Sequence, residues 1–217
     1  MAARRLETRV RREQIAEAAL RIIARRGVRA LSIAAVAEKV GIVPAAIYRH
    51  FKGKDQVLAA VLALVRAKLL ANVTAVCAES PEPLERLHLL LKRHISSIGA
   101  FVVMPRILLS EDALGSGAAT KSKVHQMIMA YLGAVMSVIG EGQARGHIRR
   151  DIPADSVALM FLGVVQPAAM IRFLTEGKVA VDVNRHTEIA WRIFSDSIRA
   201  RTRNRLQKKA TPGEKTR

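Results

Sequence analysis

A predicted helix-turn-helix at Leu31–Lys54 constrains the fold of this chain more than any other segment. Ser32 can cap a first helix, in which apolar residues recur at the spacing of one helical face. Gly41 can end that helix in a left-handed conformation without a Cβ clash. Pro44 suits the first turn of a short second helix because its missing N–H needs no partner there. Two helices joined by such a glycine-containing turn form a motif whose second helix lies in the DNA major groove.

The positive charge of the chain is concentrated at its two ends. Residues 1–54 contain 13 Lys and Arg against 4 Asp and Glu, residues 55–198 contain 15 against 13, and residues 199–217 contain 8 against 1. A basic head around a helix-turn-helix is suited to neutralising DNA phosphates. General solubility or an overall preference for arginine would explain the total charge, but not the near balance of the middle.

The composition favours helices along the whole chain. Half of the residues are hydrophobic, only 4% are aromatic, and no convincing alternating run bounded by turn residues is present. We therefore predict an all-α fold of about nine helices, with an N-terminal three-helix helix-turn-helix domain and a C-terminal helical regulatory and dimerisation domain. The expected helices lie near residues 8–26, 33–40, 44–49, from 54 onward, from 83 onward, 106–114, 118–145, 154–176 and 183–201.

Three parts of the chain are expected to differ in role. They are a DNA-binding domain over residues 1–54, a ligand-binding and dimerisation domain over 55–201, and a basic disordered tail over 202–217. The helix near 154–176 is apolar almost all round, so it should be buried on more than one face. Cys77 is the single cysteine, which excludes an intrachain disulfide and suits a reducing cytoplasm. We expect neither a signal peptide nor a membrane span.

The segment Val36–Leu58, VAEKVGIVPAAIYRHFKGKDQVL, resembles the DNA-binding region of TetR-type repressors. That family has a Tyr-x-His-Phe-x-x-Lys pattern between the motif and a long connecting helix, matched here by Tyr48, His50, Phe51 and Lys54. The resemblance covers roughly residues 8–60, and the rest is similar only in its helical architecture. It implies a repressor whose last two helices form a dimer interface.

The residues of the motif have separable expected roles. The resemblance implies DNA-backbone contacts for Tyr48, His50 and Lys54, and Ser32 can contact a phosphate in the same way. The small apolar side chains at the start of the second helix can contact a thymine methyl group. Arg49 is the candidate for reading guanine, with a phosphate contact as the alternative. The predicted DNA-binding set is Ser32, Val43, Pro44, Ala45, Ala46, Tyr48, Arg49, His50 and Lys54.

Alternatives remain open for several of these positions. Tyr48 could instead pack against Phe51, while Ile47 and Phe51 are expected to be structural anchors. Basic residues near the start of the chain, Arg4, Arg5 and Arg9, could reach an adjacent groove or the DNA backbone. A solvated flexible arm is the alternative for those three arginines.

Two weaker predictions concern the body of the protein. A mainly hydrophobic ligand pocket is expected among helices four to eight, although methionines at helical spacing are more often core residues. The candidate pocket residues are Phe101, Met104, Met127, Tyr131, Met160 and Gln166. A homodimer interface is expected on the last two helices, with packing inside one chain as the alternative. Its candidate residues are Phe161, Val164, Val165, Ala168, Ile189, Ile193 and Phe194.

Other classes of function are less consistent with the sequence. We find no phosphate-binding loop, no Gly-x-Ser-x-Gly and no His-Glu-x-x-His, so we expect no catalytic residues, no cofactor and no metal site. A membrane-surface protein should have basic faces along whole helices, whereas the body is balanced. A DNA-compacting protein would not need a large apolar body. The expected partners are double-stranded DNA with a palindromic operator, a second copy of this chain, and a small-molecule effector.

Overall fold

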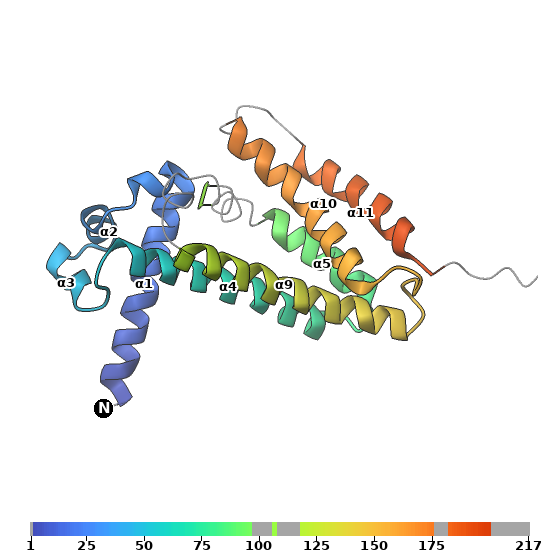
Figure 1. Ribbon diagram of the computed structural model, residues 1–217, viewed down its shortest axis with the longest axis horizontal. Helices are drawn as coiled ribbons and strands as arrows, with labels where there is room; N and C mark the ends of the chain where they lie inside the picture. The colour runs from blue at the N-terminus through green and yellow to red at the C-terminus, as the bar shows by residue number, and fades with distance from the viewer. Residues whose placement is uncertain (1, 97–105, 108–117, 176–181, 201–217) are drawn as a thin grey trace, which may run out of the picture.

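The computed structural model describes residues 2–96, 106–107, 118–175 and 182–200 (Figure 1). Within these residues the fold is all-α, as predicted, with eight α-helices and one short 3₁₀ turn. The elements are α1 (Ala2–Arg26), η1 (Val28–Ala30), α2 (Ile33–Val40), α3 (Pro44–Tyr48), α4 (Lys54–Glu79), α5 (Pro83–Ser96), α9 (Ala118–Ala144), α10 (Ala154–Leu174) and α11 (Val183–Ile198). The helix expected between residues 106 and 114 lies outside the described residues except for Arg106 and Ile107.

The helices form a small head and a larger body that share the long helix α4. Helices α1, α2 and α3 cluster at one end of α4, and α5, α9, α10 and α11 form the body around the rest of it (Figure 1). Helix α4 contacts α1, α5 and α9, which explains why its apolar stripe is buried along most of its length. A single hydrophobic core therefore runs from the head into the body.

The first helix is longer than the sequence predicted. It begins at Ala2 instead of near Thr8, and it continues to Arg26. The added residues are Ala, Arg, Leu and Glu, which are among the best helix formers, and neither Gly nor Pro interrupts them. Arg4 and Arg5, which precede the predicted helix, therefore belong to α1 together with Arg9.

The last helix ends earlier than predicted because its end pairs with a turn of the body. Helix α11 stops at Ile198, and Arg199 forms an isolated antiparallel bridge with Ile148 in the turn between α9 and α10. The Arg149 N–H donates to the Ile198 carbonyl at 2.9 Å, and the Ala200 N–H donates to the His147 carbonyl at 3.1 Å. These bonds fix α11 to the far end of the body.

The same turn explains one glycine of α9. A Cβ built on Gly142 would lie 2.6 Å from Ile148 Cδ1 and 3.1 Å from Pro83 Cβ, so the close approach of these residues requires glycine. The neighbouring Gly146 has a φ of 76°, in the left-handed region where glycine is favoured. The chain therefore turns between α9 and α10, in the gap left by the predicted helices 118–145 and 154–176.

Helix α10 differs from its prediction in burial. Its exposed large hydrophobic residues are Leu159, Met160, Ile171 and Leu174. Three helices, α5, α9 and α11, contact α10, and its described buried side chains are Val157, Ala158 and Phe161. For the described side chains of the isolated chain, the expectation that more than one face of α10 is buried is therefore wrong.

Two helices meet the length and composition of a membrane span. These are α4 and the Thr120–Ala144 part of α9, judged without any membrane present. In this structure both are packed in the body, where α4 contacts α1, α5 and α9, and α9 contacts α4, α5 and α10. Core helices of soluble proteins pass the same test, so their composition is accounted for by the buried core.

Candidate nucleic-acid interface

The turn between α2 and α3 has the geometry that the sequence predicted. The Ser32 side chain accepts a hydrogen bond from the Ala35 N–H at 3.1 Å and so caps α2. Gly41 ends α2 with a φ of 79°, and its N–H and that of Ile42 both donate to the Ala37 carbonyl, at 2.9 and 3.0 Å. Local hydrogen bonds therefore fix the angle between α2 and α3.

Helix α3 is short and depends on tertiary anchors. Ile47 is fully buried, and Phe51, just after the helix, is 1% exposed. The Arg12 guanidinium of α1 lies 4.2 Å from the centre of the Phe51 ring and also donates to the His50 carbonyl. A five-residue helix would be unstable alone, so these contacts hold α3 in place. The structural roles predicted for Ile47 and Phe51 are confirmed.

The outer side of α3 is open to solvent. Val43, Pro44, Ala45 and Arg49 are exposed, and Ala46 is half-buried. Tyr48 is 58% exposed, so more than half of its side chain faces solvent and it is not a core residue. An exposed phenol next to an exposed guanidinium can donate hydrogen bonds to phosphates or base edges.

The residues after α3 complete this surface. His50 is half-buried, and burial, followed by the nearby positive charges of Arg12, Arg11 and Arg49, lowers its pKa from the ordinary value. A neutral imidazole results near pH 7, so His50 would act as a hydrogen-bond donor instead of a cation. Lys54 is half-buried at the first residue of α4, where a helix N-terminus favours anions.

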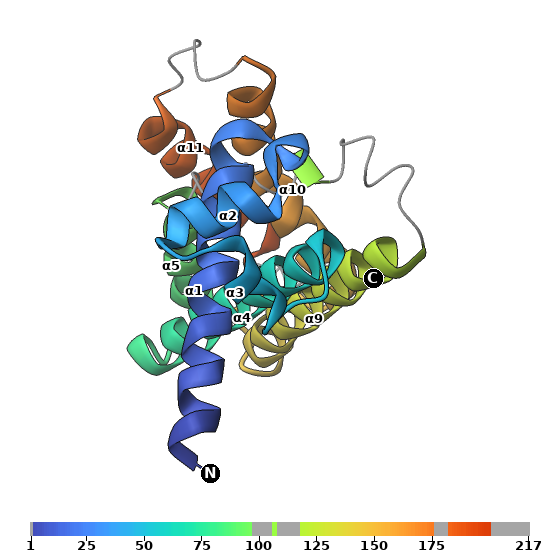
Figure 2. The ribbon, with the colours of Figure 1, turned by 90° about the vertical axis from the view of Figure 1, so that its left-hand side faces the viewer.

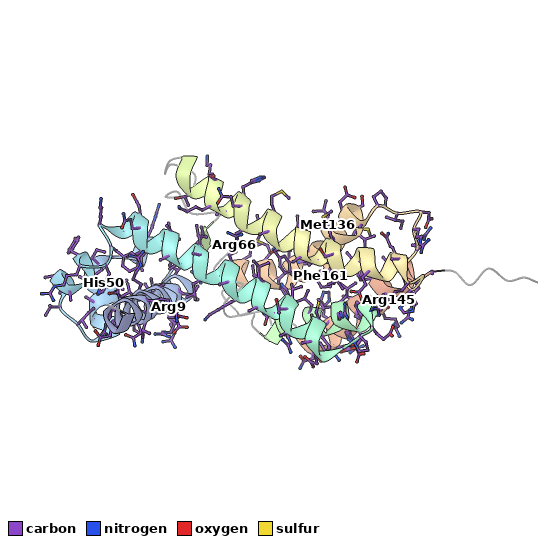
Figure 3. The ribbon with its side chains drawn as sticks, turned by 90° about the horizontal axis from the view of Figure 1, so that it is seen from below. Arg9, His50, Arg66, Met136, Arg145 and Phe161 are labelled. Atoms are coloured by element: carbon purple, nitrogen blue, oxygen red, sulfur yellow. The ribbon has the colours of Figure 1, made fainter. Side chains whose placement is uncertain are left out.

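The predicted DNA-binding residues therefore cluster at one end of the molecule. Val43 to Lys54 lie on and around α3, while Ser32 lies at the start of α2 (Figure 1). Sequence reasoning missed the part played by α1, whose Arg11 and Arg12 approach His50. The sequence shows these arginines as members of a basic helix, but gives no sign of which residues they meet. Figure 3 shows Arg9 and His50 at the same end of the protein.

The predicted pocket residues do not form one group. Met127 and Tyr131 are buried in α9, whereas Met160 is 50% exposed and Gln166 is exposed, so the prediction that these two line an internal pocket is wrong. Met160 and Gln166 face solvent because the packing of α10 against its neighbours decides which side of the helix is covered. The other two candidates, Phe101 and Met104, lie outside the described residues.

A buried polar pair, His94 of α5 and Tyr131 of α9, was not predicted as a unit. His94 of α5 is 1% exposed, and its Nδ1 lies 2.8 Å from the Leu90 carbonyl oxygen and 3.5 Å from Tyr131 Oη. Burial lowers the pKa of His94 to about 4 and raises the pKa of Tyr131. Both groups are therefore neutral at pH 7, and they are the polar part of an otherwise apolar layer that includes Phe161.

The predicted dimer residues divide into two classes. Phe161 and Phe194 are buried, with ring centres 5.7 Å apart, so they pack inside one chain and the prediction that they supply interface area is wrong. Ile189 and Ile193 are 39% and 65% exposed, and Val164 is half-buried. The side chains of Val165 and Ala168 lie outside the described part of α10.

Two helices that pack against each other, α10 and α11, both carry exposed large apolar side chains. These are Leu159, Met160, Ile171 and Leu174 of α10 with Ile189 and Ile193 of α11, and together they are called the α10–α11 surface below. The two helices run side by side along one edge of the body (Figure 1). Large apolar surfaces are unusual on monomeric proteins and mark interfaces.

Among the described residues, no three His, Cys, Asp or Glu side chains gather as metal ligands.

Comparison with known proteins gives matches over most of the chain. Residues 15–61 match the model of bacterial regulatory proteins of the tetR family, and residues 65–190 match the model of the C-terminal region of YsiA-like proteins. The HTH-type transcriptional regulator BetI of Rhizobium meliloti is 28% identical over 162 residues, which are 75% of this chain and 74% of BetI. The fatty acid metabolism regulator protein of Bacillus subtilis is 21% identical over 155 residues, covering 70% of this chain and 78% of that protein.

A solved structure shares the fold. The transcriptional regulator FadR from Bacillus subtilis, crystallised in complex with stearoyl-CoA, superposes with a TM-score of 0.72 and 18% identity. The superposition covers 86% of this chain and 98% of FadR. The fold of the head and the body is therefore that of known regulators.

Proposed function

Because this chain belongs to the TetR family of bacterial regulatory proteins, it is a DNA-binding transcriptional regulator, and we propose that it represses transcription as a ligand-released homodimer. The observation that carries the proposal is the helix-turn-helix at the tip of the head. Its second helix is anchored by Ile47 and Phe51, and its outer side is open to solvent. The DNA-contacting set proposed here is the nine residues predicted from the sequence.

Within this set, some residues are proposed to read the base sequence and others to bind the DNA backbone. Small side chains at Pro44, Ala45 and Ala46 let α3 lie deep in the major groove, where Arg49 can reach a guanine edge. Tyr48, His50 and Lys54 are proposed to bind phosphates on either side of that groove. A protein of this kind places two recognition helices about 34–36 Å apart when it dimerises on a palindromic site.

Selection of bound duplexes from a random pool tests this assignment. We expect a palindrome to be recovered, and Arg49→Ala to relax preference at one position in each half-site, at a loss of about 1–3 kcal/mol for the preferred base. Lys54→Ala should weaken binding to all sequences alike and lower the salt slope by about 1 for each phosphate that the lysine no longer neutralises. Titration of labelled duplex at several salt concentrations measures both effects.

Two results would contradict the assignment. Equal losses on selected and random DNA for both variants would remove the distinction between Arg49 and Lys54. Failure of the wild-type protein to bind any duplex at low salt would remove the proposed function itself. The exposed Arg66 of α4, which lies outside the head, is the matched control, and Arg66→Ala should change neither preference nor slope.

We propose that the α10–α11 surface pairs with its copy in a second chain. Ile189 and Ile193 lie one helical turn apart, so they share a face of α11, and the neighbouring helix α10 also carries exposed apolar residues. Two-fold symmetry brings the same surface of both chains together and so covers the apolar area of both. The division proposed for the chain, 1–54 for DNA binding and 55–201 for ligand binding and dimerisation, then falls at the start of α4.

A hydrophobic effector is proposed to bind in the body, near the layer of Met127, Tyr131 and His94. The support is a neutral polar pair inside an apolar core, which could orient one polar group of a mainly hydrophobic ligand. The relative FadR was crystallised with stearoyl-CoA, so long-chain acyl thioesters are the first ligands to test. The protein is proposed to act in the cytoplasm, where bacterial DNA and acyl thioesters both lie.

Stearoyl-CoA is expected to release the protein from its selected duplex, whereas free CoA is not. A ligand can shift DNA binding only by its preference for the DNA-free conformation, so release measures that preference directly. Met127→Trp should reduce release because Met127 is 2% exposed and a larger ring would occupy the proposed space. Met129→Trp is the matched control, because Met129 is 47% exposed on the same helix. Equal responses of both variants would place the effector elsewhere.

A further inference from the structure

The N-terminal part of α1 projects from the protein without any core of its own. All side chains from Glu7 to Gln14 are exposed, and Ile15 is the first buried residue of the helix. Figure 2, which faces the head, shows this part of α1 extending beyond α2 and α3. Because none of these side chains is buried in the protein, this part of α1 has a surface available for a partner.

A groove runs between this projecting part and the end of α3. It has a volume of about 740 Å³, and its wall on α1 includes Thr8, Arg11 and Gln14. The opposite wall is formed by Arg49 and His50. Both of these residues belong to the proposed DNA-contacting set, so a DNA strand held by them would pass the mouth of the groove.

Arg12 fixes the two walls relative to each other. It belongs to α1, yet it lies over the Phe51 ring and donates to the His50 carbonyl. The width of the groove is therefore set by contacts between α1 and the segment after α3, instead of by a flexible arm. A preformed site loses little conformational freedom on binding.

The groove offers cationic groups that can bind an anion and neutral polar groups that can contact a sugar. Two guanidinium groups, from Arg11 and Arg49, line the groove together with one carboxylate, from Glu7. Thr8 and Gln14 add neutral hydrogen-bonding groups. The Nδ1 atom of His50 is buried and has no hydrogen-bond partner in the described structure. Arginine forks match the geometry of phosphate oxygens.

We propose that this groove binds the sugar-phosphate backbone of duplex DNA outside the bases read by α3, so that α1 is a second DNA-contacting element. The inference rests on the proposed function and adds a contact to it. Helix α1 rises about 1.5 Å per residue, so the part before Gln14 spans about 18 Å. That length is enough to cross a phosphate strand from the major groove to the adjoining minor groove, which is about 6 Å wide.

Two lengths of the selected duplex test the proposal. One ends at the outermost recovered bases, and the other is extended at both ends by one helical turn, about 10 base pairs. Arg11→Gln should weaken binding to the extended duplex and make its salt slope shallower by about 1 for each phosphate that Arg11 neutralises. Glu7→Gln should strengthen binding to the extended duplex because it removes a repelling carboxylate. Both variants should bind the short duplex as the wild type does.

Arg21→Gln is the matched control, because Arg21 is an exposed arginine of α1 that pairs with Glu17 and does not line the groove. It should behave as the wild type on both duplexes. Unchanged affinity and slope of Arg11→Gln on the extended duplex would overturn the inference while the wild-type protein still bound its operator. Equal weakening on both duplexes would also overturn it, because the contact would then lie within the recognised bases. Absence of any wild-type binding would instead refute the proposed function.

Discussion

Replacing Ile193 with glutamate should convert the protein to a monomer and lower its affinity for a palindromic operator by about 10²- to 10⁴-fold. Ile193 is 65% exposed in a single chain, so the charge enters no core and the variant should remain folded. In the proposed dimer the new carboxylate would be desolvated in an apolar interface and placed near its symmetry copy. Loss of the partner would leave each head to bind a half-site alone, without the advantage of linked sites.

Sedimentation measures the oligomeric state of this variant, and titration of the selected duplex measures its affinity. Met129→Glu is the matched control, because Met129 is an exposed methionine of α9 outside the α10–α11 surface. We expect Met129→Glu to remain dimeric with wild-type affinity. A dimeric Ile193→Glu protein would show that the α10–α11 surface is not the subunit interface. Circular dichroism should be unchanged in both variants, whereas the thermal midpoint should fall only for Ile193→Glu, because a folded partner no longer stabilises the folded chain.

Acid should destabilise the wild-type protein more than a variant that lacks His94. The folded chain holds the pKa of His94 at about 4, whereas an unfolded chain has the ordinary value near 6.5. Between these two values the unfolded state binds more protons, so the free energy of unfolding falls as the pH falls. Burial is the cause, because the charged imidazolium would be placed among apolar side chains of α5, α9 and α10. The stability is fully present above pH 6.5, and its loss is complete near pH 4.

The expected loss from this histidine is about 3 kcal/mol, at roughly 1.4 kcal/mol for each pH unit between the two pKa values. Urea unfolding from pH 7 to pH 4 measures it as the difference between the profiles of the wild type and His94→Gln. His125→Gln is the matched control, because it deletes an exposed imidazole of α9 without altering the core. Parallel profiles of the wild type and His94→Gln would show that His94 is accessible to protons in the folded protein.

Local features of the fold were predictable because short-range rules control them. Ser32 caps its helix as predicted, with a hydrogen bond from the Ala35 N–H, and Asp182 caps α11 in the same way, with a hydrogen bond from the Arg185 N–H. Gly41 adopts the left-handed conformation expected after α2, and Pro44 starts α3. Each of these depends on a few neighbouring residues, so one sequence is sufficient to identify them.

The candidate site was less predictable where residues from distant segments meet. The pattern around Tyr48 predicted where the proposed DNA-binding surface lies, yet nothing in it indicated that Arg12 would cover Phe51 or that Arg11 and Arg49 would line one groove. The pairing of His94 with Tyr131 likewise joins residues far apart in the chain. Composition and periodicity place a residue on a helix, but they do not say which helix it meets.

The sequence by itself determined the order and type of the helices, the motif in the head and the basic character of the chain's two ends. Only the tertiary structure decided that Phe161 and Phe194 are buried while Met160 and Ile193 face solvent. The physical reason is that α10 is apolar almost all round, so its sequence does not indicate which side of the helix its neighbours cover. Backbone hydrogen bonds within a helix are set by nearby residues, whereas the burial of a side chain depends on how whole helices pack.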